Sequence, residues 1–266
     1  MTTLSTKEIE TLRDYTEFVE QLTDTRWYRG CAQCHDLKPS LYRHPVIKDS
    51  EELLKLESEI LKRFRQRCTP YLTATMNTDD DLNAMFIMQH FRVPTRLLDW
   101  TENPHIALYF ALNDSSYKES SGNLEYKDDV CIWVLDPVAW NNKALDVSPP
   151  PGILYSQNKE YLNGYLPTIA STSRKPDPVA LYGIFNNPRI VVQRGVFTLF
   201  GSKVEPMERI YRQHYPKDCL YKLIIKKQNV GNMLKSLVRI GITDSTIFPD
   251  LEGLARELRR EFDYLV

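Results

Sequence analysis

Two short segments of the chain hold the residue types that could do chemistry. The first is Tyr28-Arg29-Gly30, which follows an aromatic run typical of a β-strand. A glycine at this place permits a positive φ angle or the close approach of a ligand to the backbone. The arginine beside it carries a rigid fork of N–H donors that suits a carboxylate or a phosphate. Most Arg-Gly pairs are ordinary turns, so the sequence alone leaves both a ligand site and a turn open.

The second segment, residues 89–101, is denser in residues that are costly to bury. It reads Gln-His-Phe-Arg-Val-Pro-Thr-Arg-Leu-Leu-Asp-Trp-Thr, with an apolar centre between charged residues. Ionised side chains are rarely buried unless they are paired. One interpretation is a binding site; the other is a structural network in which Arg29 or Arg96 pairs with Asp99. His90 is open to the same choice, since it could equally be a half-buried structural histidine.

A third pattern, Cys31-Ala-Gln-Cys34-His35, matches the motif for covalent attachment of c-type haem. We expect no haem, because that attachment occurs in exported proteins and residues 1–8 lack the character of a signal peptide. We also expect no metal, because no second cysteine pair at metal spacing completes a zinc site. Two free thiols and a surface histidine are favoured over a zinc site that uses Cys31, Cys34 and a distant histidine.

The composition is that of an ordinary globular protein. The 266 residues are 42% hydrophobic and 26% charged, and 34 basic residues face 35 acidic ones. No overall charge therefore attracts the chain to nucleic acid or to an anionic membrane. No apolar stretch approaches the length of a membrane span, and the five cysteines are an odd, scattered set typical of reduced thiols. We expect a cytoplasmic protein.

Hydrophobic periodicity predicts the elements that position these segments. Helices are expected over Thr6–Leu22, Ser50–Arg65, Asp79–His90, His105–Leu112, Val230–Ile240 and Asp250–Phe262. Strands are expected over Thr25–Arg29, Pro94–Thr101, Val130–Leu135, Arg189–Gln193, Val196–Phe200 and Leu220–Ile225, with Lys222 on a solvated sheet edge. Asn103-Pro104 is a strong helix start. Because strands and helices do not alternate at even spacing as they do in βαβ units, we predict an α+β fold with a mixed, largely antiparallel sheet and surrounding helices.

Several of these motifs together resemble the FRG domain family, which is named for a Phe/Tyr-Arg-Gly motif. The resemblance rests on Trp27–Gly30, Leu41–Arg43, Gln89-His90, Pro94–Thr101, Asn103–Ala111, Arg189–Phe197 and Ile247–Leu254. It predicts one FRG-type domain over residues 20–266, with a helix in residues 1–19 as part of the same unit. The chain departs from the family pattern at Arg92, where a glycine is usual, and at Cys31, where a glutamine is usual.

The order of these motifs also resembles ADP-ribosyltransferase-like folds. Such folds have a strand that ends in Arg/His-Gly, a strand with Ser/Thr that leads into a buried helix, and a late strand that presents Glu or Gln. The resemblance assigns Arg29 and Gly30 to the first motif, Thr101 to the second and Gln193 to the third. It implies NAD as the ligand and a catalytic set of Arg29, Thr101 and Gln193.

The resemblance also implies how NAD would be held. The backbone of Gly30 would hydrogen-bond the nicotinamide carboxamide, and Arg29 with Arg92 or Arg96 would hold the pyrophosphate, with His90 in support. A tyrosine, Tyr28 or Tyr109, would stack on the cationic nicotinamide ring.

Cleavage of the glycosidic bond of NAD develops positive charge that a carboxylate would stabilise. Gln193 is neutral and cannot supply that charge, so Asp99 or Glu102 is the candidate acid. The expected function is an NAD-binding enzyme that transfers ADP-ribose or hydrolyses NAD. The expected role is that of a bacterial toxin or phage-defence effector, which acts on an unknown protein or nucleic acid and is held in check by a neutralising partner. The alternative is a recognition module that binds a nucleotide or a nucleic-acid end in the same cleft without turnover. A metal-dependent nuclease built on Asp99 and His90 is the least favoured, because one carboxylate makes a poor magnesium site.

Overall fold

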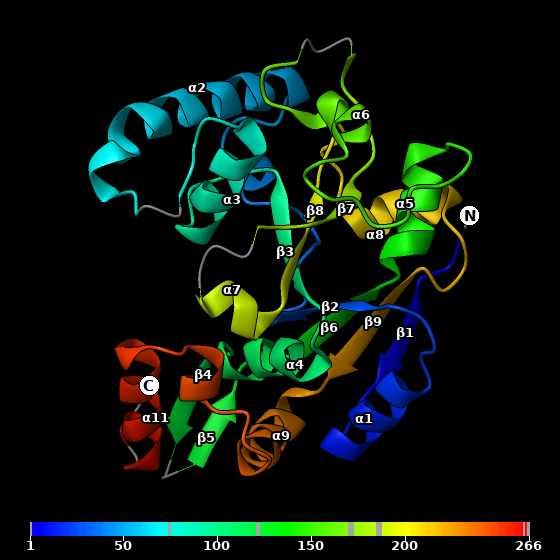
Figure 1. Cartoon of the computed structure of the whole chain (residues 1–266). Coiled ribbons are helices and arrows are strands. Elements are labelled where there is room, and N and C mark those ends of the chain that lie inside the picture. Colours follow the sequence, from blue (N-terminus) through cyan, green and yellow to red (C-terminus); the bar gives the residue numbers. More distant parts are fainter. Residues whose placement is uncertain are drawn as a thin grey trace.

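The computed structural model describes residues 2–73, 76–120, 123–169, 173–184, 188–262 and 264. Within them a seven-stranded sheet runs in the order β1-β9-β6-β2-β3-β8-β7 (Figure 1). Its strands are β1 (Ser5–Glu8), β2 (Trp27–Cys31), β3 (Leu97–Thr101), β6 (Val130–Leu135), β7 (Val179–Tyr182), β8 (Gly195–Leu199) and β9 (Leu220–Ile225). β1 pairs with β9 in parallel, whereas each of the other paired neighbours is antiparallel. The predicted α+β class with a mixed, largely antiparallel sheet is confirmed.

Helices cover both faces of this sheet (Figure 1). They are α1 (Leu12–Glu20), α2 (Ser50–Cys68), α3 (Asp81–His90), α4 (Pro104–Asn113), α5 (Pro137–Leu145), α6 (Lys159–Leu162), α7 (Pro188–Gln193), α8 (Met207–His214), α9 (Lys227–Arg239), α10 (Asp244–Ile247) and α11 (Leu251–Glu261). Short 3₁₀ turns lie at Leu41–Arg43, Thr69–Tyr71 and Asn163–Tyr165, and a separate hairpin joins β4 (Tyr117–Ser120) to β5 (Asn123–Tyr126).

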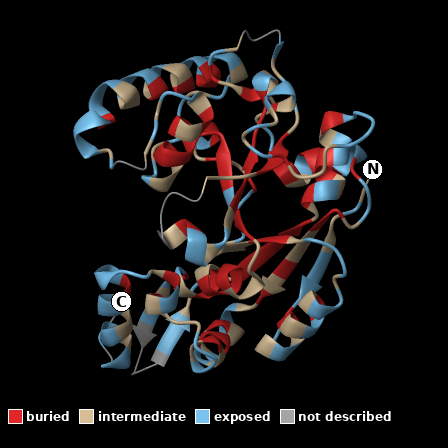
Figure 2. Cartoon of the chain, in the orientation of Figure 1, coloured by how far each residue is buried: buried red, intermediate tan, exposed pale blue. Residues whose placement is uncertain are grey.

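The central strand β6 explains why the sheet is covered on both sides. All of its residues are buried, and they alternate between two hydrophobic cores, as a strand with two covered faces requires. Val130, Ile132 and Val134 pack with α1, α4 and α9. On the other face Trp133 lies in a core with Trp27, Trp100 and Trp140. All three of Trp100, Trp133 and Trp140 are buried, and Figure 2 shows α4 and the middle of the sheet as buried.

The sheet is weakly joined at one place, between β2 and β3. Strand β2 pairs with β6 at five positions, and β3 pairs with β8 at five. By contrast, β2 and β3 share a single pair, Tyr28 with Thr101. Beyond this pair the two strands separate, so the sheet consists of two well-paired halves that meet at one bridge.

Helix α4 begins as predicted. The Asn103 side chain accepts hydrogen bonds from the backbone N–H groups of His105 and Ile106, and Pro104 occupies the first helical turn. The helix is buried nearly all round, with Ala107, Leu108 and Ala111 fully covered. Asn103 and Pro104 therefore fix where this buried helix starts against the sheet.

Other sequence predictions need correction. Residues 6–22 are not one helix, because β1 pairs with β9 before α1 begins at Leu12. Arg189–Gln193 is helical and belongs to α7, not to a strand. Lys222 does not lie on a sheet edge, because β1 covers the outer side of β9, and its ammonium group lies 5.0 Å from the centre of the Trp133 ring.

Candidate functional site

Gly30 sits inside β2 and faces α4. A Cβ atom added there would lie 1.9 Å from the Ala107 carbonyl oxygen and 2.7 Å from the Ala111 nitrogen. The strand and the helix backbones approach so closely that no side chain fits between them. The close approach expected of a ligand is therefore made by α4. The strand was predicted to end at Arg29, but it continues through Gly30 to Cys31.

Arg29 points to the other face and reaches across the opening between β2 and β3. One terminal nitrogen of its guanidinium group donates to the backbone carbonyl of Asp99 over 2.5 Å. That carbonyl lies just beyond the single bridge between the two strands, where no strand-to-strand pairing satisfies it. The Arg29 side chain thus replaces a lost hydrogen bond of the sheet, and 23% of its surface still meets solvent.

The Asp99 carboxylate is held beside Arg29 and faces outward. It accepts a hydrogen bond of 2.7 Å from the Gln89 side-chain nitrogen, and one of its oxygens lies 3.9 Å from the Arg29 guanidinium. Gln89 is itself fixed, because its side-chain oxygen accepts from the Thr95 hydroxyl over 2.5 Å. The Asp99 side chain is 55% exposed. Of the two arginines considered as partners of Asp99, the structure places Arg29 beside it, and the carboxylate remains accessible.

Arg43 and His90 lie within electrostatic range of Asp99. The pKa of the Arg43 guanidinium is lowered by partial burial and by the like charge of Arg29, while Asp99 opposes the shift. The pKa of His90 is lowered by partial burial and by the nearby positive charge of Arg189, and Asp99 again opposes the shift. We call Arg29, Arg43, Gln89, His90 and Asp99 the Arg29–Asp99 cluster.

Arg96 was predicted to hold a pyrophosphate, but it is completely buried. Its guanidinium group pairs with the Glu57 carboxylate over 2.7 Å and donates to the backbone carbonyls of Phe200 and Tyr165. Arg96 and Glu57 each have 0% exposure. Since all of these partners lie inside the protein, Arg96 is a structural residue and cannot meet a ligand.

The tyrosines expected to stack on a nicotinamide ring are also buried. Tyr109 is fully covered, and its hydroxyl donates to the Asp244 carboxylate over 2.6 Å. Burial raises the pKa of Tyr109 well above its ordinary value, and the Asp244 carboxylate adds to the shift. Tyr28 is 5% exposed and packs in the core beside α4. Neither ring presents a face to a ligand in this structure.

Thr101 and Gln193 contact one another, but through structural hydrogen bonds. The Thr101 hydroxyl donates to the backbone carbonyl of Gln193 over 2.6 Å and accepts from the Asn103 N–H. The Gln193 side chain donates to the Ile247 carbonyl, and the residue ends α7 instead of lying on a strand. The second and third expected motifs meet, yet the hydrogen bonds of their side chains go to backbone groups and hold the fold.

Arg92 follows α3 with a φ angle of 59°. This left-handed conformation favours glycine, which explains in physical terms why a glycine is usual there in the family pattern. The Arg92 side chain is exposed, and its charge acts on the carboxyl group of Asp114 at the end of α4. The predicted cation is therefore present at the surface, but no contact in the described residues links it to Asp99.

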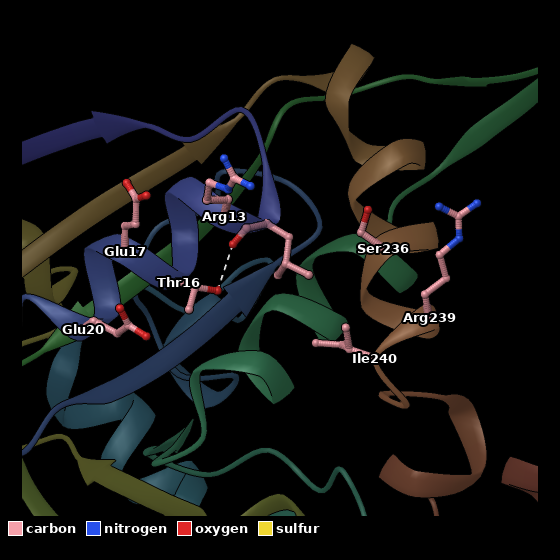
Figure 3. A pocket seen from close by; sticks show the side chains of 8 residues that line it. Arg13, Thr16, Glu17, Glu20, Ser236, Arg239 and Ile240 are labelled. Atoms are coloured by element: carbon pink, nitrogen blue, oxygen red, sulfur yellow. Dashed lines mark hydrogen bonds between the residues drawn. The ribbon is translucent and has the colours of Figure 1, made fainter.

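Two surface grooves lie apart from this cluster. One, of about 580 Å³, runs between α1 and α9 and is lined by Arg13, Thr16 and Glu17 on one side and by Ser236 and Arg239 on the other (Figure 3). A larger groove of about 1840 Å³ lies between the β4–β5 hairpin, α9 and α11. None of the predicted site residues lines either groove.

Sequence reasoning missed two residues of interest. Arg43 lay within the Leu41–Arg43 motif but was assigned no role, although its charge acts beside Arg29. Cys31 was set aside with the haem-like motif, yet its pKa is lowered to about 6 by a hydrogen bond from Cys131, with Arg29 contributing. The spacing of Cys31 two residues after Arg29 was the available signal, because alternate residues of a strand share a face.

The described residues offer neither a metal site nor a membrane span. They contain no group of three or more His, Cys, Asp or Glu side chains arranged to hold a metal ion. They also contain no helix of the length and hydrophobicity needed to cross a bilayer.

Residues 24–120 match the family model of the FRG domain. This segment is an FRG domain. It contains β2, the Leu41–Arg43 turn, α3, β3 and α4, and hence every member of the Arg29–Asp99 cluster. The match ends before β6, so the extent predicted for the domain, residues 20–266, stays a prediction. No curated protein and no solved structure matches the chain, and the likeness to ADP-ribosyltransferase folds likewise stays a prediction.

Proposed function

We propose that the FRG domain binds NAD at the Arg29–Asp99 cluster and that the protein is an ADP-ribosyltransferase-like enzyme, which transfers ADP-ribose or hydrolyses NAD. One observation carries the proposal: the accessible carboxylate of Asp99 lies 3.9 Å from the Arg29 guanidinium and within electrostatic range of Arg43. A dinucleotide needs cations for its pyrophosphate. Its glycosidic bond needs a fixed negative charge when it breaks. The cluster offers both within one exposed group.

Arg29 and Arg43 would hold the pyrophosphate. Arg29 is already fixed by its hydrogen bond to the Asp99 carbonyl, so little side-chain entropy is lost when it meets an anion. Its carboxylate partner is 3.9 Å away, which is a loose contact. This leaves donor capacity on the guanidinium group for a phosphate oxygen.

Asp99 would serve the bond-breaking step in place of Gln193. The C1′–N bond of the nicotinamide ribose breaks, its electron pair leaves with neutral nicotinamide, and positive charge develops on the ribose. The Asp99 carboxylate, oriented by Gln89, would stabilise that charge. Water or an acceptor nucleophile then forms the new bond to C1′ and releases a proton. The acceptor of ADP-ribose would be a protein or a nucleic acid.

A second candidate function is nucleotide recognition without turnover. It is favoured by the placement of Thr101 and Gln193, whose polar groups are engaged in structural hydrogen bonds. It is also favoured by Gly30, whose open side is occupied by α4. In this alternative the same arginines bind a nucleotide, or the phosphate at a nucleic-acid end, and Asp99 only positions Arg29.

NAD consumption would explain a role as a toxin or as a defence effector against phage. Such a protein would act in the cytoplasm, where NAD is available, and its host would require a neutralising partner protein. This part of the proposal predicts that the wild-type chain is harder to express than an inactive variant.

The deciding experiment measures nicotinamide release from NAD by purified protein, with and without cell lysate. Asp99→Asn keeps the shape and the Gln89 contact but removes the charge, and we expect it to lower the release rate by a factor on the order of 10² or more. Arg43→Ala should weaken NAD binding and raise KM. Arg67→Ala, an exposed arginine on α2, is the matched control and should behave as wild type.

Three outcomes are distinguishable. Release that depends on Asp99 supports the enzyme. Protection of the protein against heating by NAD, without release and dependent on Arg43, supports the recognition module. Neither release nor protection would overturn both, because the cluster then binds no NAD.

A further inference from the structure

Three cysteines converge at the end of β2, on the chain segment that was set aside as haem-like. Cys31 is the last residue of β2, and its Cα partner on the neighbouring strand is Cys131 of β6. Cys34 lies in the loop that follows, with its sulfur 3.8 Å from the Asp129 carbonyl oxygen just before β6. Cys34 is exposed, Cys31 is half-buried and Cys131 is fully buried.

The three thiols affect one another's protonation. The interaction with the buried Cys131 thiol lowers the pKa of Cys31 and of Cys34, and the pKa of Cys131 is itself raised. A buried thiol that keeps its proton is a donor, so the two outer sulfurs are the acceptors. The outer sulfurs are therefore stabilised as thiolates.

Cations add to this effect on each outer sulfur. Beside the Cys131 hydrogen bond, Arg29 and His35 lower the pKa of Cys31, which is about 6. For Cys34 the Cys131 hydrogen bond comes first and Lys222 second, and its pKa is about 7, although Cys31 and Asp129 act against the shift. Two cysteines that are separated by two residues and have lowered pKa values are typical of redox-active dithiols. By contrast, burial raises the pKa of Cys219 well above its ordinary range.

We propose that Cys31 and Cys34 form a redox-active dithiol that a peroxide oxidises to a disulfide, with Cys131 as the buried hydrogen-bond donor that is not consumed. The exposed Cys34 thiolate attacks hydrogen peroxide, so that an S–O bond forms, the O–O bond breaks and hydroxide leaves to become water. The Cys31 thiolate then attacks the sulfenic sulfur, the S–S bond forms and the second hydroxide leaves. Two thiols and one peroxide thus give one disulfide and two waters, and each sulfur loses one electron.

Oxidation would change the charge beside Arg29. The positive charge of Arg29 lowers the pKa of Cys31, and a disulfide sulfur carries no negative charge to balance that guanidinium group. The proposed dithiol does not depend on NAD binding, because its evidence lies in the thiols alone.

The test uses the reduced full-length chain treated with a small excess of hydrogen peroxide, followed by alkylation and peptide mass spectrometry. We expect free thiols to fall from five to three per chain, with the missing pair on the one peptide that carries Cys31 and Cys34. Dithiothreitol should restore all five. In Cys31→Ser the sulfenic acid should persist on Cys34 and be trapped by dimedone.

Two controls keep the assignment open to refutation. Cys68→Ser, which removes a buried cysteine on α2, should still lose two thiols. Cys131→Ala should give the same disulfide more slowly at pH 7, because the outer sulfurs lose their donor. A disulfide that includes Cys131 would overturn the assignment, and so would five free thiols after peroxide treatment.

Discussion

Arg29 and Arg96, which were both candidates to hold a pyrophosphate, have opposite environments. Arg29 keeps contact with solvent, whereas Arg96 is enclosed with Glu57 between α2 and the end of β8. A sequence pattern indicates that a charged residue near a buried strand needs a partner, but not which partner it finds. The partner of Arg96 is Glu57, which lies 39 residues earlier in the chain, among the buried residues of α2.

The buried pair gives a stability prediction at the residue scale. Arg96→Met leaves the Glu57 carboxylate buried without a partner, which costs about 3–5 kcal/mol in the free energy of unfolding. Urea denaturation measures the loss. Arg67→Ala on the exposed side of α2 is the control and should change stability by less than about 0.5 kcal/mol.

A double variant separates charge from shape at this pair. Arg96→Met combined with Glu57→Met removes both charges and should recover a large part of the lost stability. A single variant as stable as the wild type would show that Glu57 is not held as a buried carboxylate.

At the scale of elements, the packing of α4 on β2 depends on one glycine. Gly30→Ala places a methyl group against the Ala107 carbonyl, at a contact made by backbone, which has little room to shift. We expect a loss of about 1–3 kcal/mol in the free energy of unfolding, measured by thermal or urea denaturation.

Gly195→Ala is the matched control for this prediction. Gly195 is also a strand residue, and an added Cβ there would lie 3.4 Å from the Ile190 side chain, which can adjust. The argument for tight backbone packing fails if the two alanine variants cost the same.

The sequence predicted elements well where local signals decide them. The Asn103-Pro104 start of α4 and the buried strand β6 were both found, because capping chemistry and a continuous apolar run are local features. α7 was missed because Ile190, Val191 and Val192 are β-branched and favour a strand in isolation. In the fold a helix places Ile190 inside and leaves Val191 55% exposed, so tertiary packing overrode the local preference.

The candidate site was also predicted only in part. The sequence indicated Arg29 and Asp99 as neighbours, because an ionised residue near a buried strand requires a partner. It could not indicate the separation of β2 from β3, since this depends on how two halves of the sheet meet at Tyr28 and Thr101. For that reason Arg43 was overlooked. Tyr109 was expected to stack on a nicotinamide ring, whereas its ring is buried and its hydroxyl is bonded to Asp244.

At the scale of the whole molecule, one carboxyl group couples the fold to pH. Glu208 opens α8, and its side chain accepts from the Leu37 N–H over 3.2 Å. Burial raises the pKa of Glu208 to about 7, and the neighbouring Asp36 carboxylate adds to the shift against the hydrogen bonds from the backbone. This residue ties the loop after β2 to a helix on the opposite half of the sheet.

The consequence is a loss of stability with rising pH. The ordinary pKa of a glutamate is 4.5, so between that value and about 7 the folded chain binds more protons at this site than the unfolded chain. Stability therefore falls as the pH rises through this window and changes no further above it.

Glu208→Gln keeps an oxygen for the Leu37 N–H but has no proton to lose. We expect the variant to gain about 1–2 kcal/mol relative to the wild type between pH 5 and pH 8, less than a fully enclosed carboxyl would give, because Glu208 keeps some contact with solvent. Urea unfolding at both pH values measures the difference, and Glu205→Gln, an exposed neighbour, should leave the wild-type pH profile unchanged. If Glu208→Gln retains that profile as well, the protonation of Glu208 is not what makes the stability of the fold depend on pH.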